Sequence, residues 1–211
     1  MRTQPRASLE PRKTPIQTRS TVTVDTIAEA TIQVLLSVGP DQLTTTRVAA
    51  RAGVSVGTLY QYFPNKHSLL FSVLQQHLNH VAEAVEGACR QNHGQRVATM
   101  VESVVQAFVD AKMQRADIST ALYAVATGRE ETALVKNAGK RMRVALASML
   151  ATASDAHFDD LPSTSFLVFS AMGGVLKTVL EGGAPPRTVR SLRRQLVLLF
   201  RGYLISVAAQ P

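Results

Sequence analysis

One serine lies between two glycines in a spacing that can support nucleophilic catalysis. The stretch Gly53-Val-Ser55-Val-Gly57 has the G-x-S-x-G pattern of serine hydrolases, in which a sharp turn between a strand and a helix presents the hydroxyl. The residues before Gly53 have a helical pattern instead, and no alternation of strands and helices surrounds them. We therefore expect no hydrolase site and assign no catalytic residue.

A second group of side chains could bind a metal ion. His77, His80 and Glu83 recur at helical spacing, so they could share one face of a helix. No second cluster of ligands accompanies them in this stretch, and we expect neither a metal site nor a cofactor. The single cysteine, Cys89, excludes an intrachain disulfide and is consistent with a reducing compartment.

The segment around Ser55 has the pattern of two short helices joined by a turn. Thr44 or Thr45 can cap the first helix, which ends at Gly53, because a glycine can adopt the left-handed conformation of a sharp turn. Ser55 can cap a second helix that starts at Val56 and ends at the next proline. Two helices joined around a glycine by three or four residues form a helix-turn-helix motif.

The outer surface of the second short helix suits DNA recognition. We expect Ala49, Val54 and Leu59 to pack inside. The opposite surface carries Val56 and the hydroxyl, amide and aromatic groups of Thr58, Tyr60, Gln61 and Tyr62. Hydroxyl and amide groups can bind phosphates and base edges. The net charge of +8, from 23 basic and 15 acidic residues, also favours a polyanionic partner.

Helical periodicity continues along the rest of the chain, so we expect an all-α fold of about nine helices. Besides the two short helices, the apolar spacing predicts helices over Thr23–Val38, from Lys66 to about Ala88, and over Val97–Met113, Ile118–Val125, Glu130–Thr152, Phe166–Leu180 and Ser191–Ala208. The pair Gly173-Gly174 weakens its helix by about 1 kcal/mol per glycine relative to alanine. We interpret this pair as a place where another helix crosses closely.

The composition changes along the chain. Residues 1–20 carry five basic residues, one acidic residue and three prolines, which predicts a disordered basic arm that could add phosphate contacts. Residues 21–67 hold the helix-turn-helix, and residues 68–211 form the helical remainder. No signal peptide is visible, and no apolar run reaches the ~20 residues that span a bilayer. We therefore expect a cytoplasmic protein without a membrane partner.

Residues 43–70 resemble the DNA-binding signature of the TetR family of bacterial transcriptional regulators. The resemblance rests on Val-Ala-Ala-Arg-Ala-Gly-Val, on Ser-Val-Gly-Thr-Leu-Tyr-Gln-Tyr-Phe and on Asn-Lys-His-Ser-Leu-Leu. It implies an N-terminal three-helix head and a ligand-binding and dimerisation domain over residues 68–211. It also implies a homodimer held through the last two long helices and a small-molecule pocket inside the C-terminal domain.

The same resemblance assigns DNA contacts to one set of residues: Thr45, Thr46, Arg47, Ser55, Val56, Gly57, Thr58, Tyr60, Gln61, Tyr62 and Lys66. Within the set, Tyr62 and Lys66 match positions that reach phosphates, while Gln61 faces the major groove. The Gln61 amide can pair with adenine, which makes it the best candidate for a base contact. Leu59 and Phe63 are expected in the core.

We hypothesise a dimeric repressor whose partners are a double-stranded DNA operator with an inverted repeat and a small-molecule effector that releases it. The candidate pocket residues are Phe108, Tyr123, Met142 and Phe169. Two alternatives stay open. One is an activator or a constitutive regulator without ligand control, and the other is a helical ligand-binding or scaffold protein.

Overall fold

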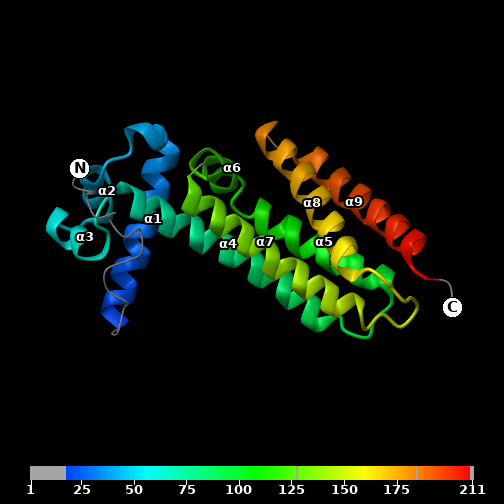
Figure 1. Ribbon diagram of the computed structural model, residues 1–211. Helices are drawn as coiled ribbons and strands as arrows, with labels where there is room; N and C mark the ends of the chain where they lie inside the picture. Colours follow the sequence, from blue (N-terminus) through cyan, green and yellow to red (C-terminus); the bar gives the residue numbers. More distant parts are fainter. Residues whose placement is uncertain (1–17, 127, 184, 210–211) are drawn as a thin grey trace, which may run out of the picture. The chain divides into compact units, whose positions relative to one another are not determined.

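The computed structural model describes residues 18–126, 128–183 and 185–209, which form nine α-helices (Figure 1). The helices are α1 Thr18–Gln42, α2 Thr45–Ala52, α3 Val56–Tyr62, α4 Lys66–Gln91, α5 Val97–Met113, α6 Ala116–Val125, α7 Arg129–Leu150, α8 Leu161–Glu181 and α9 Pro186–Val207. No strand occurs among the described residues, so the predicted all-α class is confirmed. Most of the predicted basic arm, residues 1–17, lies outside the described residues.

The chain divides into two compact units. One comprises Met1–His77 with Ala121–Thr132, and the other comprises Leu78–Thr120 with Ala133–Pro211. The division falls within α4 and again at α6, since each of these helices contributes residues to both units.

The first unit contains α1, α2 and α3, which pack around a small apolar core. The side chains of Ile27, Leu43 and Phe63 are fully buried in it. At Gly39 the φ angle is 75°, which interrupts the helical geometry of α1 where the sequence predicts that this helix closes. This break allows the chain to turn toward α2.

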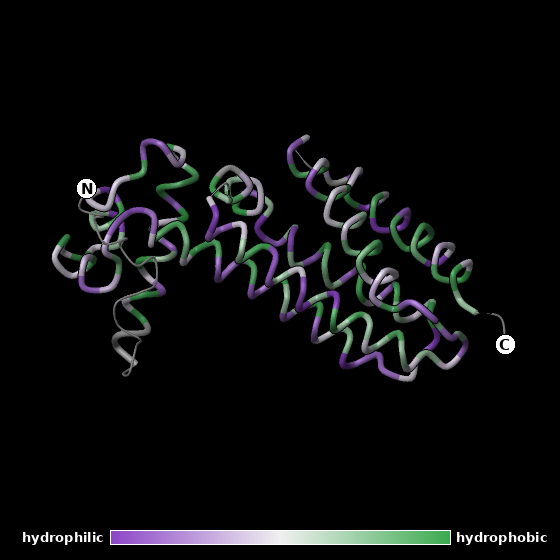
Figure 2. The backbone as a smooth tube through the Cα atoms, in the orientation of Figure 1, coloured by the Kyte–Doolittle hydropathy of each residue, from purple (hydrophilic) through white to green (hydrophobic). Residues whose placement is uncertain are grey.

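The second unit is built on α5, which buries residues from Val97 to Lys112 and packs against α9. Figure 2 shows hydrophobic and hydrophilic residues alternating along the helices, as amphipathic helices require. Arg141 on α7 donates to both carboxylate oxygens of Glu86 at 2.9 Å and to Oδ1 of Asn79 at 2.9 Å. This hydrogen bonding lowers the pKa of the Glu86 carboxyl and attaches α7 to α4.

The glycine pair in α8 corrects one sequence interpretation. A Cβ atom placed on Gly173 or Gly174 would meet nothing within 4 Å, so no helix of the described chain crosses there. The same holds for Gly202 on α9. All three positions therefore lie where the chain leaves open space.

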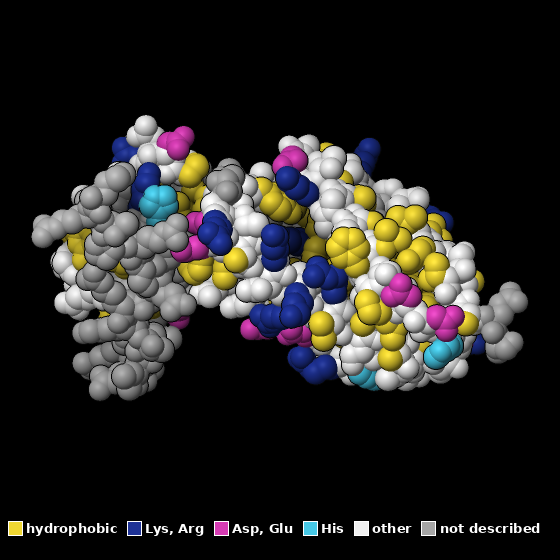
Figure 3. Space-filling model, viewed as in Figure 1, with side chains coloured by type: hydrophobic (Ala, Val, Ile, Leu, Met, Phe, Trp, Pro, Cys, Tyr) yellow, Lys and Arg dark blue, Asp and Glu magenta, His cyan; other side chains and the backbone are white. Residues whose placement is uncertain are grey.

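An exposed apolar surface covers α8 and α9. Its large side chains are Phe166, Leu167, Val175, Leu198, Leu199 and Ile205, of which Ile205 is 61% exposed. Figure 3 shows hydrophobic side chains gathered over this part of the second unit. The opposite side of α9 is buried through Leu192, Leu196 and Phe200. Apolar side chains thus occupy two sides of α9, only one of which is covered within the chain.

Two helical stretches, Val22–Gln42 and Leu161–Glu181, are long and apolar enough to cross a membrane by length and composition alone. This differs from the expectation that no apolar run reaches that length. The core helices of soluble proteins pass the same test. The apolar composition of α8 is explained in part by packing, because Met172 and Leu176 are buried in the core of the second unit.

Candidate nucleic-acid interface

The turn between α2 and α3 is formed as the sequence predicts. Oγ1 of Thr44 accepts a hydrogen bond from the backbone N–H of Arg47 at 3.3 Å, which caps α2. At the other end Gly53 has a φ angle of 67°, and its N–H bonds to carbonyls of the last helical turn. This left-handed conformation is costly for a residue with a Cβ, so glycine allows the sharp turn.

The serine of the G-x-S-x-G pattern is a helix cap. Oγ of Ser55 accepts from the backbone N–H of Thr58 at 2.9 Å and lies 2.8 Å from Oγ1 of Thr58. Ser55 therefore follows a helix and a turn, where a nucleophile elbow would need a preceding strand. Its hydroxyl fixes the start of α3.

Burial fixes which side of α3 faces outward. Leu59 and Phe63 are fully buried, as predicted, whereas Val56 is 36% and Tyr60 44% exposed. Gln61 is exposed as well. The core contacts of Leu59 and Phe63 thus hold the short helix with its hydroxyl, aromatic and amide groups toward solvent.

All eleven residues predicted to contact DNA lie at least partly at the surface. Seven are exposed, namely Thr46, Arg47, Ser55, Val56, Gly57, Tyr60 and Gln61, and four are half-buried, namely Thr45, Thr58, Tyr62 and Lys66. They come from the N-terminal turn of α2, from α3 and from the first residue of α4. Each therefore has some surface exposed to solvent, and its contact with DNA stays a prediction.

Hydrogen bonds between these elements position the surface. Oγ1 of Thr45 and the phenol oxygen of Tyr60 lie 3.1 Å apart, which connects the start of α2 to the exposed side of α3. At the start of α4, Oδ1 of Asn65 accepts from the N–H of Ser68 at 2.9 Å and caps the helix that begins at Lys66.

One supporting pair was missed by the sequence analysis. Nε of Arg51 on α2 donates to Oε1 of Gln33 on α1 at 2.5 Å. Eighteen residues separate the two along the chain, so no helical spacing could have indicated the contact. The pair orients α2 on α1.

The candidate pocket residues are distributed over both units. Phe108 and Phe169 are buried in the second unit with their rings edge to face, the centroids 6.1 Å apart. Met142 is also buried there. Tyr123 is half-buried and belongs to the first unit. The role of these four residues in a pocket stays a prediction.

A buried lysine in the second unit was not anticipated. Lys112 is only 8% exposed, and burial lowers the pKa of its ammonium group to about 8. Its position could have indicated this, since it follows Val101, Val105 and Phe108 along one side of α5. Cys89 is buried too, and burial raises the pKa of its thiol to about 12.

The capped helices, the glycine turn and the exposed α3 define a protein of the helix-turn-helix class. Residues 23–73 match the family described as bacterial regulatory proteins, tetR family, and residues 97–204 match the C-terminal domain described as tetracyclin repressor-like. The chain belongs to the tetR family of bacterial regulatory proteins.

Two curated relatives match parts of the chain. The HTH-type transcriptional regulator BetI of Serratia proteamaculans is 29% identical over 95 residues, 44% of this chain and 48% of the relative. The fatty acid metabolism regulator protein of Bacillus subtilis is 33% identical over 60 residues, 28% of this chain and 31% of the relative. The matches thus span about half or less of each relative.

Solved structures share the fold over most of the chain. A putative TetR-family regulator from Mesorhizobium loti aligns with a TM-score of 0.74 at 17% identity, covering 92% of this chain and all of the other. The regulator FadR from Bacillus subtilis, solved in complex with stearoyl-CoA, aligns with a TM-score of 0.67 at 17% identity, covering 83% and 96%. At these identities the likeness concerns the fold.

Proposed function

We propose that this protein is a dimeric, cytoplasmic transcriptional repressor that binds an inverted-repeat operator and is released by a small-molecule effector. The observation that carries the proposal is the surface of α3, where buried Leu59 and Phe63 hold Val56, Tyr60 and Gln61 outward. No catalytic role is assigned to Ser55, because its hydroxyl caps α3.

In the proposed complex α3 enters the major groove. Gln61 binds a base edge, and the hydroxyl and aromatic groups of Thr58 and Tyr60 bind neighbouring bases or sugar-phosphate groups. Tyr62 and Lys66 bind phosphates, together with groups at the start of α2 such as Arg47. The predicted basic arm adds sequence-independent contacts to the duplex.

A second copy of the chain covers the exposed apolar surface of α8 and α9. Leu198, Leu199 and Ile205 would be desolvated in such a dimer. The open positions at Gly174 and Gly202 support close approach of the partner's helices, because no side chain occupies that space. A two-fold dimer then presents two heads at about 34–36 Å, the spacing of successive major grooves on one side of DNA.

The effector binds in the C-terminal domain, where Phe108, Met142 and Phe169 are buried apolar and aromatic side chains that could line a pocket. The stearoyl-CoA complex of the Bacillus subtilis regulator makes an acyl-CoA one candidate. A near-complete release needs the effector to favour the DNA-free state by about 5.5 kcal/mol.

Binding to nonspecific duplex DNA at increasing salt tests the DNA-binding part of the proposal. We expect affinity to fall steeply with salt, because each neutralised phosphate releases counterions. Absence of binding at low salt would contradict the proposal and favour a scaffold protein. Selection of bound sequences from random DNA then identifies the operator, and an inverted repeat is the expected result.

Repression is separated from activation by the position of the operator. A reporter with the selected site overlapping its promoter should be repressed by the protein and derepressed by the effector. Increased expression would favour an activator, and repression that no acyl-CoA or other effector relieves would favour a constitutive regulator.

A further inference from the structure

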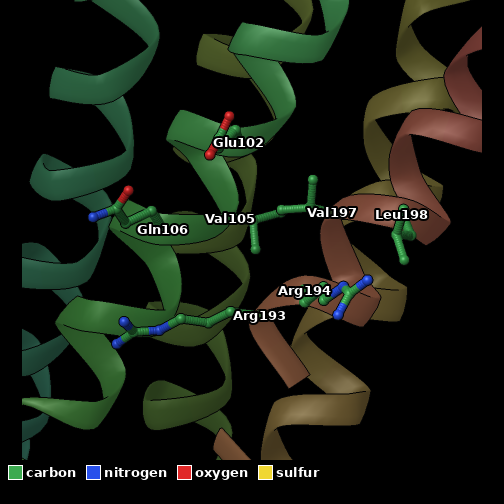
Figure 4. Close-up of a pocket in the computed structure, with 7 residues that line it drawn as sticks. All are labelled: Glu102, Val105, Gln106, Arg193, Arg194, Val197 and Leu198. Atoms are coloured by element: carbon green, nitrogen blue, oxygen red, sulfur yellow. The ribbon is translucent and has the colours of Figure 1, made fainter. Parts of the chain in front are cut away.

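The groove between α5 and α9 is lined by groups that the chain already uses for its own contacts. Val105 of α5 is buried, and Arg193 of α9 reaches toward α5 and forms an ion pair with Asp110. The guanidinium groups of Arg193 and Arg194 point to opposite sides, so they do not converge on one ligand (Figure 4). An open position with exposed groups around it lies instead on α3, at Gly57.

The fold does not require a glycine at position 57. Gly57 is the second residue of α3 and is not one of the glycines with a positive φ angle, so its backbone conformation suits any residue. Its chain neighbours apart, the only described side-chain atom within 4 Å of an added Cβ is Oγ of Ser55, at an ordinary 3.7 Å. Because alanine has the higher helix propensity, stability does not account for the missing side chain.

Three exposed side chains border the open space over Gly57, which we call the Gly57 notch. Val56 precedes the glycine, and Tyr60 and Gln61 follow one turn later on the same side of α3. Oγ1 of Thr45 lies 3.1 Å from the phenol oxygen of Tyr60, and this hydrogen bond directs the tyrosine toward α2. Neither Tyr60 nor Gln61 has an atom within 4 Å of the Cβ position, so the notch stays open.

The groups around the notch suit one feature of the DNA major groove. Val56 and the ring of Tyr60 offer apolar surface, whereas the carboxamide of Gln61 is polar. Among the base edges in the major groove, the apolar group is the C5-methyl of thymine. A position without a side chain allows such a group to approach the helix backbone closely. A methyl group over Gly57 would contact apolar surface and leave Gln61 free to bind the neighbouring base.

We propose that the Gly57 notch receives the methyl group of a thymine, beside the base that Gln61 binds. The proposed entry of α3 into the major groove is the basis of this contact. The methyl group makes van der Waals contact with Cα of Gly57 and with the side chain of Val56, and no charge takes part. Each half-site of the operator therefore contains a thymine next to the base pair that Gln61 contacts.

Operators in which uracil replaces single thymines test the contact, because uracil lacks only the methyl group. The selected operator and its uracil series are titrated with the full-length wild-type protein and with Gly57→Ala. We expect uracil at one position of a half-site to weaken wild-type binding about fourfold, the contribution of one methyl group. Gly57→Ala should bind the thymine operator about tenfold more weakly, because its added methyl overfills the notch. Uracil at the same position should restore part of that loss.

Gly87→Ala is the matched control. It makes the same substitution in a helix of the second unit, where the added Cβ would meet only the Arg90 side chain at 3.8 Å, and it should bind every operator as the wild type does. Equal binding of the thymine operator by Gly57→Ala and the wild type would overturn the proposal. So would a weakening that uracil relieves at no position. A wild-type protein that binds no duplex at all would contradict the proposed function itself.

Unfolding measurements on the same Gly57→Ala protein separate contact from folding. The variant should be as stable as the wild type while it binds the thymine operator more weakly, because the added Cβ meets DNA and not the chain. Loss of stability in proportion to the loss of binding would overturn the proposal.

Discussion

At the scale of single residues, Gln61 is the side chain whose chemistry best suits a base contact. Its carboxamide lies on the exposed surface of α3 and can bond to both N6 and N7 of adenine. We expect Gln61→Ala to weaken operator binding about tenfold and to remove the preference at one base pair, since such a pair contributes about 1–3 kcal/mol. Competition binding with operators changed at single positions measures both effects.

Lys66→Ala is the matched control for this prediction. A lysine that binds a phosphate should contribute equally to all sequences, so its loss should weaken every site alike and reduce the salt slope by about 1. If Gln61→Ala behaves like Lys66→Ala, with base preference intact, the assignment of Gln61 to a base edge is wrong.

Lys112 has a predictable effect on stability. Its folded-state pKa of about 8 lies below the ordinary value of 10.5, so between these pH values the unfolded chain binds more protons and stability rises with pH. Methionine is uncharged and of similar length. We expect Lys112→Met to be more stable than the wild type at pH 7, with the difference shrinking toward pH 10.5.

Urea unfolding of both proteins at several pH values measures this difference. Lys136→Met, which removes a lysine at an exposed position of α7, serves as the control. A Lys112→Met protein that is less stable at every pH would indicate that the ammonium group makes interactions worth more than its desolvation.

At the scale of elements, the turn between α2 and α3 depends on the backbone of Gly53. Alanine there would keep a φ angle of 67°, a conformation that costs a side-chain-bearing residue about 1–2 kcal/mol. We expect Gly53→Ala to lower the unfolding free energy by that amount and to weaken DNA binding. Chemical denaturation measures the first effect and operator titration the second.

Gly57→Ala is the control within the same motif. Gly57 lies inside α3, and an added Cβ would meet only Oγ of Ser55 at an ordinary 3.7 Å. The unfolding free energy of the Gly57→Ala protein should stay the same or rise, because alanine has a higher helix propensity than glycine. Equal destabilisation by both substitutions would mean that the left-handed turn is not the cause.

The helix-turn-helix motif could be predicted closely because its signals are local in the sequence. Contacts that depend on tertiary packing could not be predicted. Caps at Thr44 and Ser55 and the glycine at 53 act within a few residues, so α2 and α3 begin and end where the sequence indicates. Long-range contacts such as Arg51 with Gln33 leave no such local pattern. The residues that line a pocket likewise cannot be identified from helical periodicity. Apolar spacing indicates which side of a helix is buried, but it does not show which buried sides enclose a ligand.

The two apolar sides of α9 illustrate the same limit. Leu196 is buried within the chain, whereas Leu199, three residues later, is 54% exposed. Both are leucines at helical spacing. The sequence therefore cannot distinguish a side of the helix that packs within the chain from a side that packs against a second copy. The glycine pair in α8 shows the same ambiguity, because no helix of the described chain crosses there and the close crossing is left to the proposed partner.

At the scale of the whole molecule, the exposed surface of α8 and α9 predicts a dimer that a single charge should disrupt. We expect Ile205→Glu to weaken self-association about a hundredfold or more, because an unpaired carboxylate would be buried at the interface. Sedimentation at several concentrations measures this effect. Binding to the full inverted repeat should fall with it, while binding to a half-site changes little.

Val144→Glu provides the comparison. Val144 is an apolar residue of α7 that is 60% exposed and lies outside α8 and α9. The same substitution there should leave self-association unchanged. If both variants remain dimers, the interface lies elsewhere on the molecule.

The burial of Cys89 makes it possible to measure the proposed effect of the effector on the two heads by spin labelling. Its thiol is buried and its pKa is about 12, so at neutral pH it is neither accessible nor ionised and should escape thiol-directed labels. A cysteine introduced at exposed Ala50 on α2 could then carry a spin label without removal of the native thiol. In a two-fold dimer each copy contributes one label, so a single electron-electron distance, recorded with and without a candidate effector, would report the separation of the two heads.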